Sequence, residues 1–170
     1  IAYVLRFRHL QAQPIAKSLQ IVSTQAHPSQ NSLNHEALHH EKEILEMIAL
    51  DNPLNQILQD VCDRMERLLD NGSVCAIMLF DQSSRCLQLA AAPSLEPELQ
   101  AQIEHLKIKP GTWTCGIAIE RQQISITEDI VNDPHWSRST ASPADAGYRS
   151  CWSVPINTAF NSLLGTVDIY

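Results

Sequence analysis

A run of eight residues at 73–80 constrains the fold more than any other segment, because nearly every position in it is apolar. A strand that is apolar on both sides has to be covered on both faces, so it belongs in the middle of a sheet. Residues 81–84 have the composition of a tight turn. Residues 85–91 then alternate polar and apolar side chains, as a returning strand does. The two runs therefore predict a β-hairpin whose first strand is central.

The segment before this hairpin has the pattern of an amphipathic helix. Asn52 can accept hydrogen bonds from free N–H groups at the helix start, and Pro53 fits the first turn. Asn71 and Gly72 end the pattern, since glycine readily adopts the left-handed conformation that follows many helices. Between these signals, apolar residues recur at helical spacing along one face: Leu54, Ile57, Leu58, Val61, Cys62, Met65, Leu68 and Leu69.

The rest of the chain supplies further helices and strands. We expect a helix over 93–106, a short helix near 116–119, and strands over 123–127, 149–155 and 163–170. Helix, hairpin, helices and three more strands predict an α+β fold, with one antiparallel sheet, helices packed on one face and loops over the other. The last strand runs to the end of the chain, so we expect the domain to be truncated at its C-terminal end.

Two stretches precede this domain. Residues 1–10 alternate apolar and basic side chains, which predicts a strand. A single strand cannot stand alone, and this one resembles the closing strand of an upstream PAS domain. Residues 11–34 are polar, with Pro14 and Pro28 to interrupt helices, and this composition is typical of a linker.

Residues 35–50 predict a connector helix between the linker and the domain. Leu38, Leu45 and Ile48 recur at helical spacing. A helix that leads into a regulatory domain often continues into a dimer seam. We therefore expect a homodimer formed through the helices at 35–69.

The composition argues against two classes of partner. A formal net charge of −7 is opposite in sign to the clustered positive charge with which proteins bind nucleic acid. No run of about 18 consecutive apolar residues occurs, so we expect no membrane span. An odd number of cysteines without a CxxC pair favours reduced thiols in the cytoplasm, at Cys62, Cys75, Cys86, Cys115 and Cys151.

Several short phrases occur in an order and spacing that resemble a GAF domain. They are ILEMI at 44–48, APSL at 92–95, PGTWTCG at 110–116, ITEDI at 126–130, DPHW at 133–136, YRSCWSVPI at 148–156 and LLGTV at 163–167. The resemblance covers residues 44–170. This segment is similar to GAF modules of bacterial sensor proteins with GGDEF, EAL or histidine-kinase outputs. What it implies is a cytosolic regulatory domain, often dimeric, with a cavity between the sheet and its covering loops.

Two features suggest where a ligand binds. Gly111 and Gly116 bracket the entry to a short helix, whose free N–H groups suit an anion or polar ligand, although a turn that only needs glycine explains them as well. The three tryptophans suit the walls of a small-molecule pocket, or equally a packed core. The pocket candidates are Phe80, Trp113, Cys115, Gly116, Asp129, Trp136, Cys151 and Trp152. Asp129 also suits a role as a cap or turn residue of its own loop.

The cysteines raise one enzymatic alternative, a thiol-based redox enzyme or sensor like the GAF branch that reduces free methionine sulfoxide. Cys115 falls where that branch carries one of its thiols. The branch's other cysteine lies in a loop ahead of the closing strand, whereas Cys151 lies inside the strand expected at 149–155 and the loop 134–148 has none. A thiol nucleophile also needs a setting that lowers its pKa. We therefore expect no catalytic residue and no enzyme in this chain.

The residue pattern also disfavours cofactors and metals. Photoreceptor GAF domains attach a bilin through a Cys-His pair, which this sequence lacks, so no covalent bilin is expected. Haem would depend on a lone histidine such as His105 or His135, which is a weak signal. His35, His39 and His40 have helical spacing but no third ligand beyond nearby glutamates, so we expect no metal site.

The sequence as a whole predicts a regulatory sensory domain of a bacterial signalling protein. We expect it to bind an unknown small cytosolic molecule, to mediate dimerisation, or both. Either action would control an output domain for cyclic-di-GMP turnover or histidine-kinase activity. The sequence identifies neither the ligand nor the output domain.

Overall fold

The computed structural model describes residues 30–69, 72–109, 111, 113–136 and 143–170. Within these ranges the helices are α2 (Gln30–Ala49), α3 (Leu54–Leu69), α4 (Pro97–Ile103) and α5 (Thr114–Arg121). The strands are β1 (Cys75–Asp81), β2 (Cys86–Ala91), β3 (His105–Lys107), β4 (Ser125–Thr127), β5 (Cys151–Asn157) and β6 (Leu163–Ile169). The PAS-like strand expected at 1–10, and the expected linker up to residue 29, lie outside the described residues.

The connector helix α2 begins earlier than its hydrophobic pattern indicates. It starts at Gln30, inside the stretch 11–34 that the composition assigns to a linker, and it ends at Ala49. No proline or glycine occurs between residues 30 and 49, so no residue there interrupts helical hydrogen bonding. Among the helices in the described part of the chain, none is both long and apolar enough to cross a membrane.

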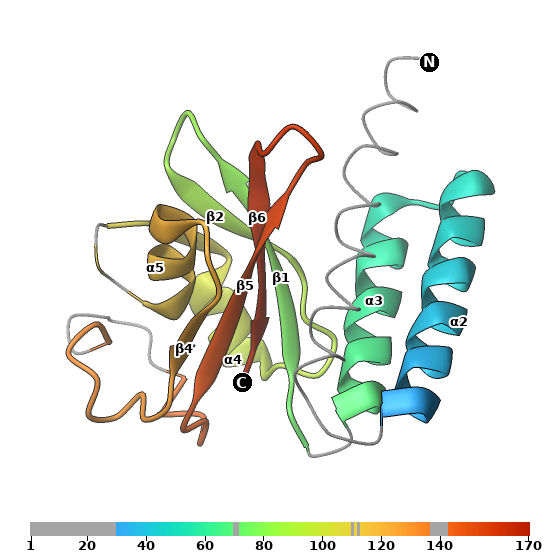
Figure 1. Ribbon diagram of the computed structural model, residues 1–170. Coiled ribbons are helices and arrows are strands. Elements are labelled where there is room, and N and C mark those ends of the chain that lie inside the picture. Colours follow the sequence, from blue (N-terminus) through green and yellow to red (C-terminus); the bar gives the residue numbers. More distant parts are fainter. Residues whose placement is uncertain (1–29, 70–71, 110, 112, 137–142) are drawn as a thin grey trace.

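One sheet organises the domain (Figure 1). Its strands follow the order β3-β2-β1-β6-β5-β4, and every neighbouring pair is antiparallel. β1 and β6 therefore lie in the middle, which confirms the central strand that the apolar run at 73–80 predicts. β1 and β2 form the expected hairpin, with Phe80 opposite Leu87 across the pair.

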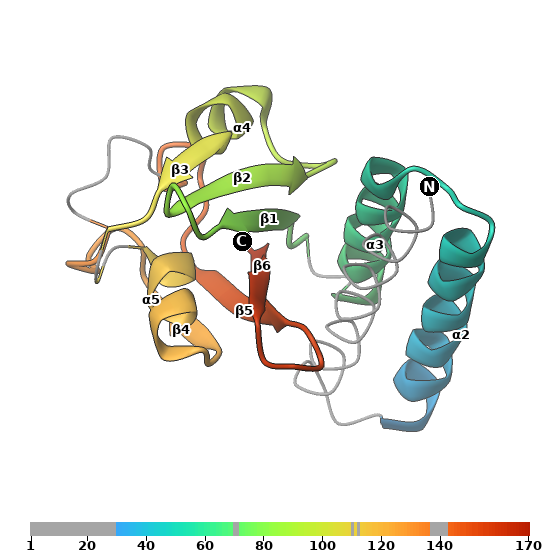
Figure 2. The same ribbon diagram turned by 90° about the horizontal axis from the view of Figure 1, so that it is seen from above.

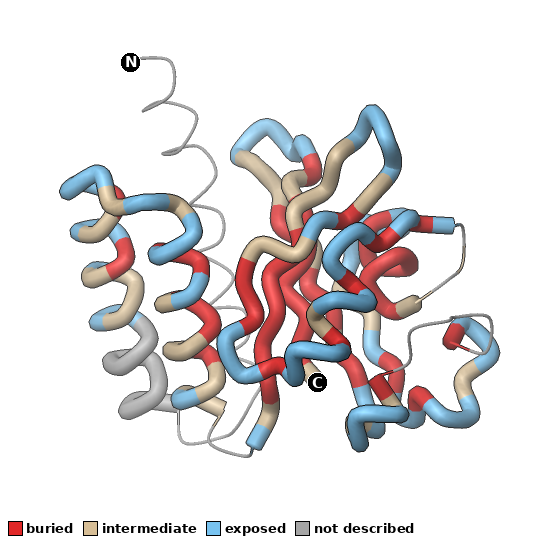
Figure 3. Tube along the Cα trace, turned by 180° about the vertical axis from the view of Figure 1, so that it is seen from behind, coloured by how far each residue is buried: buried red, intermediate tan, exposed pale blue. Residues whose placement is uncertain are grey.

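The helix pair α2–α3 covers one side of the sheet, which we call the α3 face (Figure 2). The apolar stripe of α3 packs there against side chains of β1 and β6, and Ile44 and Ile48 of α2 join the same cluster. Buried residues recur along α3 and dominate the central strands (Figure 3). The residues that α3 buries are Ile57, Leu58, Val61, Cys62 and Met65. This cluster provides the driving force that holds the helix pair on the domain.

Ion pairs add a polar connection between α2 and α3. The guanidinium of Arg64 on α3 contacts the carboxylates of Glu43 on α2 and Asp60 on its own helix. Only 14% of the Arg64 side chain is exposed, so this group is screened less than a surface ion pair. The pKa of Glu43 is lowered, chiefly by its hydrogen bond with Arg64. The contact therefore links α2 to α3 in addition to their apolar packing.

Two short helices and loops cover the opposite side, which we call the α5 face. A second apolar cluster there joins β1 and β2 to side chains of α4, β3 and α5. The core is thus split by the sheet into two layers, as the alternation of side chains along each strand requires. The expected α+β fold is confirmed, and α4 and α5 accompany the loops on this second face.

The helix expected over 93–106 is shorter than the sequence pattern indicates. α4 begins at Pro97, a favoured residue at a helix start, and ends at Ile103. Residues 105–107 instead form β3, in which Leu106 pairs with Leu87 of β2. The reason lies in the alternation after residue 103: Leu106 and Ile108 are buried, whereas the residues between and beside them are exposed. A period of two favours a strand.

Gly165 allows the two central strands to approach closely. It pairs with Leu79, and a Cβ atom built at Gly165 would lie 1.9 Å from the carbonyl oxygen of Met78. No real Cβ atom tolerates that separation. The register between β1 and β6 therefore depends on a glycine at this position.

Candidate functional site

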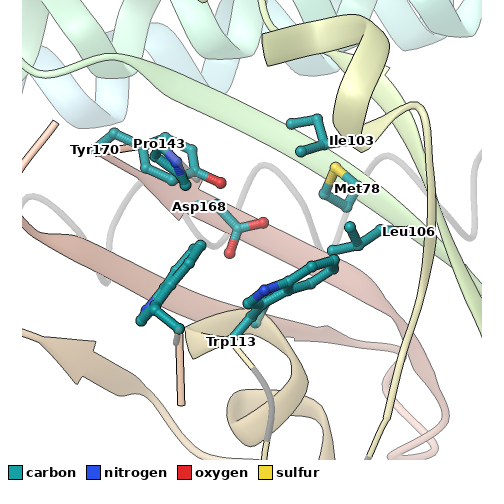
Figure 4. Close-up of a pocket in the computed structure, with 9 residues that line it drawn as sticks. Met78, Ile103, Leu106, Trp113, Pro143, Asp168 and Tyr170 are labelled. Atoms are coloured by element: carbon teal, nitrogen blue, oxygen red, sulfur yellow. The ribbon is translucent and has the colours of Figure 1, made fainter. Parts of the chain in front are cut away.

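A small cavity lies on the α5 face, between the central strands and the layer of α4, β3 and α5 (Figure 4). Its free volume is about 10 Å³, which leaves room for about one water molecule. The lining is mostly apolar and aromatic, and it includes one carboxylate. The residues that line it are Met78, Ile103, Leu106, Trp113, Cys115, Trp136, Pro143, Asp168 and Tyr170.

Two indole rings form one wall of the cavity. The rings of Trp113 and Trp136 are tilted by 31°, and their centroids lie 6.2 Å apart, which is within the range of favourable aromatic pairs. The two residues come from different loops. The backbone N–H of Trp113 donates to the carbonyl of His135 over 3.2 Å, and His135 Nδ1 lies 2.6 Å from the carbonyl oxygen of Gly111. These contacts bind the two loops to each other over the sheet.

Trp113 holds an unusual backbone conformation at the start of α5. Its φ of 57° and ψ of 156° lie in a region that residues other than glycine rarely adopt. Such a conformation costs roughly 1–3 kcal/mol and persists only where the surrounding contacts impose it. The ring contact with Trp136 and the backbone bond to His135 are two such contacts.

Hydroxyl groups lie directly behind the second indole. Trp136 Nε1 donates to Thr114 Oγ1 over 3.2 Å and is 3.4 Å from Thr127 Oγ1. The two threonine oxygens are 2.7 Å apart and hydrogen-bonded to each other. Thr114 also hydrogen-bonds to the thiol of Cys151. The buried indole N–H is therefore satisfied, and the network reaches from the loop into strand β5.

The carboxylate of Asp168 stands on β6 at the base of the cavity. The residue is 1% exposed, and Thr166 Oγ1 donates to its Oδ2 over 2.9 Å. Its other oxygen, Oδ1, is buried and has no hydrogen-bond partner among the described residues. Burial raises the pKa of Asp168 from 3.8 to about 6, and hydrogen bonds from Ser153 and Thr166 oppose that rise. The carboxylate is thus desolvated, mostly ionised at neutral pH, and incompletely paired.

The buried polar residues of the described chain gather on the α5 face in and behind the cavity. They are Thr114, Thr127, Ser153, Thr166 and Asp168. Burying a polar group costs free energy unless hydrogen bonds replace its lost water. A fold that only needed a core would gain by placing apolar side chains at these positions. Their concentration beneath two indole rings marks the cavity as the candidate functional site.

Two buried thiols belong to this region, those of Cys115 and Cys151. Cys115 lines the cavity, and Cys151 Sγ lies 3.8 Å from Ser153 Oγ. Burial raises the pKa of both thiols well above the ordinary value, and the nearby charge of Asp168 adds to the rise. A reactive cysteine needs the opposite setting, because the thiolate is the attacking species.

The structure brings together half of the sequence-derived candidates. Trp113, Cys115 and Trp136 line the cavity. Cys151 is buried next to Trp136 in a small cluster with Ile130. These four residues come from α5, the residue before it, the 129–136 loop and β5. All of these segments lie on the α5 face of the sheet or form part of the sheet.

Cys151 and the other four candidates are not among the lining residues. Trp152 packs in the cluster of the α3 face, because alternation along β5 points it away from its neighbour Cys151. Asp129 is exposed and stabilises its own loop, accepting hydrogen bonds from Val131 N and the Asn132 side chain. Gly116 is buried within α5, where a Cβ would make ordinary contact with Ile108. Phe80 packs against the apolar cluster of the α5 face at the end of β1.

Sequence reasoning missed six lining residues, and a signal for one of them was available. Asp168 is the one charged residue of the segment 163–170, and it alternates with Val167 and Ile169. An aspartate is almost never fully buried in a strand unless its carboxylate has a partner. The remaining five residues are Met78, Ile103, Leu106, Pro143 and Tyr170, which are apolar or aromatic and carry no local signal.

The described residues offer little for a metal or haem. No three His, Cys, Asp or Glu side chains among them come together as a metal site requires. His105 and His135 are both exposed, and neither lines the cavity. His39 lies 3.5 Å from Glu43 on the exposed side of α2.

An antiparallel sheet with a helix pair on one face and a covered cavity on the other defines a class of small α+β domains. The family model of the GAF domain matches residues 51–170, and the chain belongs to that family.

Relatives of known description agree with this assignment. A methyl sulfide methyltransferase-associated sensor of Methanosarcina acetivorans is 26% identical over 130 residues, which are 76% of this chain but 13% of that protein. The GAF domain of an Acinetobacter phosphoenolpyruvate-protein phosphotransferase is similar with a TM-score of 0.59 and 18% identity, over 78% of this chain and 74% of that one. A free methionine-R-sulfoxide reductase of Neisseria meningitidis is similar with a TM-score of 0.57 and 18% identity, over 79% of this chain and 74% of that one. At these identities the two structures share only the fold.

Proposed function

We propose that this GAF domain is the sensory module of a larger signal-transduction protein and that a small molecule binds in the cavity above Asp168. The observation that carries the proposal is the group of buried polar side chains under Trp113 and Trp136. The sensor relative from Methanosarcina acetivorans supports a sensory role. The chain spans a small part of that relative, so the role of the whole protein belongs to the proposal as well.

A bound ligand would offset costs that the domain bears without one. Asp168 Oδ1 is buried without a partner, and Trp113 holds a strained backbone conformation. A ligand that supplies a hydrogen-bond donor and contacts the indoles would compensate for both. Because the free volume is close to that of a water molecule, an organic ligand has to displace some lining side chains. Binding and conformational change are therefore coupled in this proposal.

The proposed signal passes through β6 to the helix pair. Asp168 lines the cavity, whereas Val167 and Ile169 pack in the cluster that contains α3. A ligand that shifts β6 would change the packing of α3 and, through the Arg64–Glu43 contact, of α2. We propose that these helices form a cytoplasmic homodimer seam.

We propose that the seam controls a bacterial output domain for cyclic-di-GMP turnover or a histidine kinase. The resemblance of the sequence phrases to GAF modules of such sensors supports this output. Ligand binding then has to differ in affinity between two arrangements of the helix pair, since a ligand without such a difference shifts no equilibrium.

A ligand screen by thermal unfolding tests the proposed function. The panel contains cationic, anionic and neutral metabolites, and a ligand of the cavity raises the melting temperature in a concentration-dependent way. The Trp113→Ala variant should lose that rise. Phe160→Ala is the matched control, because Phe160 is an aromatic residue of the β5–β6 turn that is 87% exposed. If no compound raises the melting temperature, the domain acts only as a dimerisation relay.

One enzymatic alternative has a specific observation in its favour, since Cys115 lines the cavity and the fold is similar to a methionine sulfoxide reductase. The raised thiol pKa values argue against it, and we propose that the domain is not an enzyme. Turnover of free methionine-R-sulfoxide with a thiol reductant tests the alternative. Activity that is lost in both Cys115→Ser and Cys151→Ser would replace the proposal with the reductase assignment.

A further inference from the structure

We infer that the ligand of this cavity is a small organic cation with an ammonium head group, held by the carboxylate of Asp168 among the rings of Trp113, Trp136 and Tyr170. The inference rests on the proposed function, because it specifies what the proposed cavity accepts. It follows from the charge, the hydrogen-bond capacity, the aromatic content and the size of the site.

The described residues that line the cavity carry formal charge of one sign only. Asp168 is the one formally charged residue among the described residues that line the cavity, and Lys, Arg and His are absent from that set. Figure 4 shows its carboxylate projecting into the space between Tyr170, Trp113 and Met78. Among the described lining residues, an anionic ligand would meet this carboxylate without a compensating positive group, whereas a cation would neutralise it.

The hydrogen-bond capacity points the same way. An ionised carboxylate only accepts hydrogen bonds, and Asp168 Oδ1 accepts none from the described residues. Its Oδ2 already accepts a hydrogen bond from Thr166 Oγ1. The group that completes the site therefore has to be a donor, and an ammonium N–H is the donor that also balances the charge.

The aromatic rings favour a cation over a neutral donor such as an alcohol. The electron-rich faces of Trp and Tyr attract ammonium groups, most strongly where water is excluded. Two indoles with centroids 6.2 Å apart and the ring of Tyr170 all belong to the lining. A neutral hydroxyl would satisfy Oδ1 but would gain nothing from the rings.

The size of the cavity limits the head group. A free volume of about 10 Å³ accepts a group of about the size of ammonium or water without rearrangement. Methylated head groups require the lining side chains to move. Trp113 is the lining residue whose movement would release backbone strain. The cavity thus suits small ammonium head groups and excludes extended ones.

Among the described residues, Asp168 is the group near the cavity that responds to pH. The titratable groups that interact with it are the thiols of Cys115 from α5 and Cys151 from β5 and the hydroxyl of Tyr170 after β6, and burial raises the pKa of all three. Cys75 of β1 also interacts with it, and a hydrogen bond with Cys62, together with burial, raises the pKa of that thiol. The elements β1, β3 and α4 contribute Met78, Leu106 and Ile103 to the lining, none of which titrates. A bound cation requires ionised Asp168, so binding at low pH has to expel a proton.

Titration calorimetry with a matched pair of compounds tests the inference. The probes are methylammonium and ethylammonium, whose N–H groups can donate to Asp168, with methanol and ethanol as their neutral counterparts and sodium chloride as the ionic-strength control. We expect the two ammonium compounds to bind and the alcohols to bind at least roughly tenfold more weakly. Asp168→Asn should weaken ammonium binding by roughly 30-fold or more, because it removes one partner of a buried charge pair. Glu98→Gln, which removes an exposed carboxylate of α4, should leave it unchanged.

A pH series on the unaltered protein keeps the test independent of how the Asp168→Asn variant folds. The affinity for methylammonium should fall by about tenfold for each pH unit below about 6, and it should be level above about 7. Equal binding of methylammonium and methanol, or an affinity that does not depend on pH, would overturn the cation inference. If only anionic or neutral metabolites raise the melting temperature, the sensory function stands and the cation inference fails. If no compound does, both fail.

Discussion

Val167 and Asp168 are neighbours in β6, and their side chains belong to opposite layers of the domain. Val167 is fully buried in the cluster with α3, whereas Asp168 lines the cavity under the indole rings. In the proposed mechanism, a ligand that moves Asp168 also moves a residue on which α3 packs. The sheet itself is then the connection between ligand and helix pair.

Asp168 should destabilise the domain at neutral pH. Its pKa is 3.8 ordinarily and about 6 in the folded protein, so between these values the folded state holds the proton more tightly than the unfolded state. The stability that this provides is present below about pH 4 and is lost as the pH rises through about 6, a difference of about 3 kcal/mol. Asp168→Asn should therefore raise the free energy of unfolding by up to about 3 kcal/mol at neutral pH and by little at about pH 4.

Urea denaturation of both proteins at the two pH values measures this difference. The Glu98→Gln variant serves as the control, since it removes an exposed carboxylate and should behave as the parent protein does at both pH values. If Asp168→Asn has the same effect at both pH values, the carboxylate is not ionised within the folded domain at neutral pH.

Two glycines should respond to alanine in opposite directions. Gly165→Ala places a methyl group against the Met78 carbonyl and should destabilise the domain by about 1–3 kcal/mol, as overpacking of a core does. Gly116→Ala adds a methyl group in ordinary contact with Ile108, and alanine favours a helix interior by about 0.5–1 kcal/mol. Chemical denaturation should therefore give opposite signs. Destabilisation by both changes would mean that Gly116 has a role beyond its place in the helix.

How much of this structure is predictable depends on how local its causes are. The α3 stripe and the 73–80 run follow from periodicity and burial, which are properties of adjacent residues, and the structure confirms them. The boundary of α4 depends on the pairing of Leu106 with Leu87, which is a contact between segments distant in sequence. The local spacing of apolar residues through Leu106 favours a helix, but the pairing with β2 makes residues 105–107 a strand.

The candidate site shows the same limit. Trp113 and Trp136 stand out in the sequence as rigid aromatic residues, and the fold places both at the cavity. Trp152 has the same residue type but faces the other layer, because the phase of β5 fixes which side it occupies. The phase of a strand follows from its pairing with neighbours, which the sequence of that strand alone does not reveal.

The contact of Arg64 with Glu43 should hold α2 on the domain. Arg64→Ala leaves the carboxylates of Glu43 and Asp60 without their shared partner, so α2 should open more often. Hydrogen exchange of the α2 amides should then be several-fold faster. Lys42→Ala is the control, because Lys42 pairs with Glu46 where both side chains are largely exposed. Unchanged exchange in Arg64→Ala would show that apolar packing alone holds α2.

The proposed dimer should depend on the exposed leucines of α2. Leu38 and Leu45 are seven residues apart, lie on one side of the helix, and are 54% and 38% exposed. Replacing both by glutamate should convert a dimer into a monomer, as measured by light scattering after gel filtration. Phe160→Glu changes an exposed apolar residue elsewhere and should leave the mass unchanged. A parent domain that is monomeric at high concentration would contradict the proposed seam.

The most direct test of a ligand site on the α5 face is a crystal structure of the domain with a compound that raises its melting temperature. We expect the compound to lie among Trp113, Trp136 and Tyr170, with one of its donor atoms within hydrogen-bond distance of Asp168 Oδ1. A compound that instead occupies the open groove beside α3 and α4, lined in part by Gln59 and Gln100, with the cavity above Asp168 unchanged, would rule out the proposed ligand site.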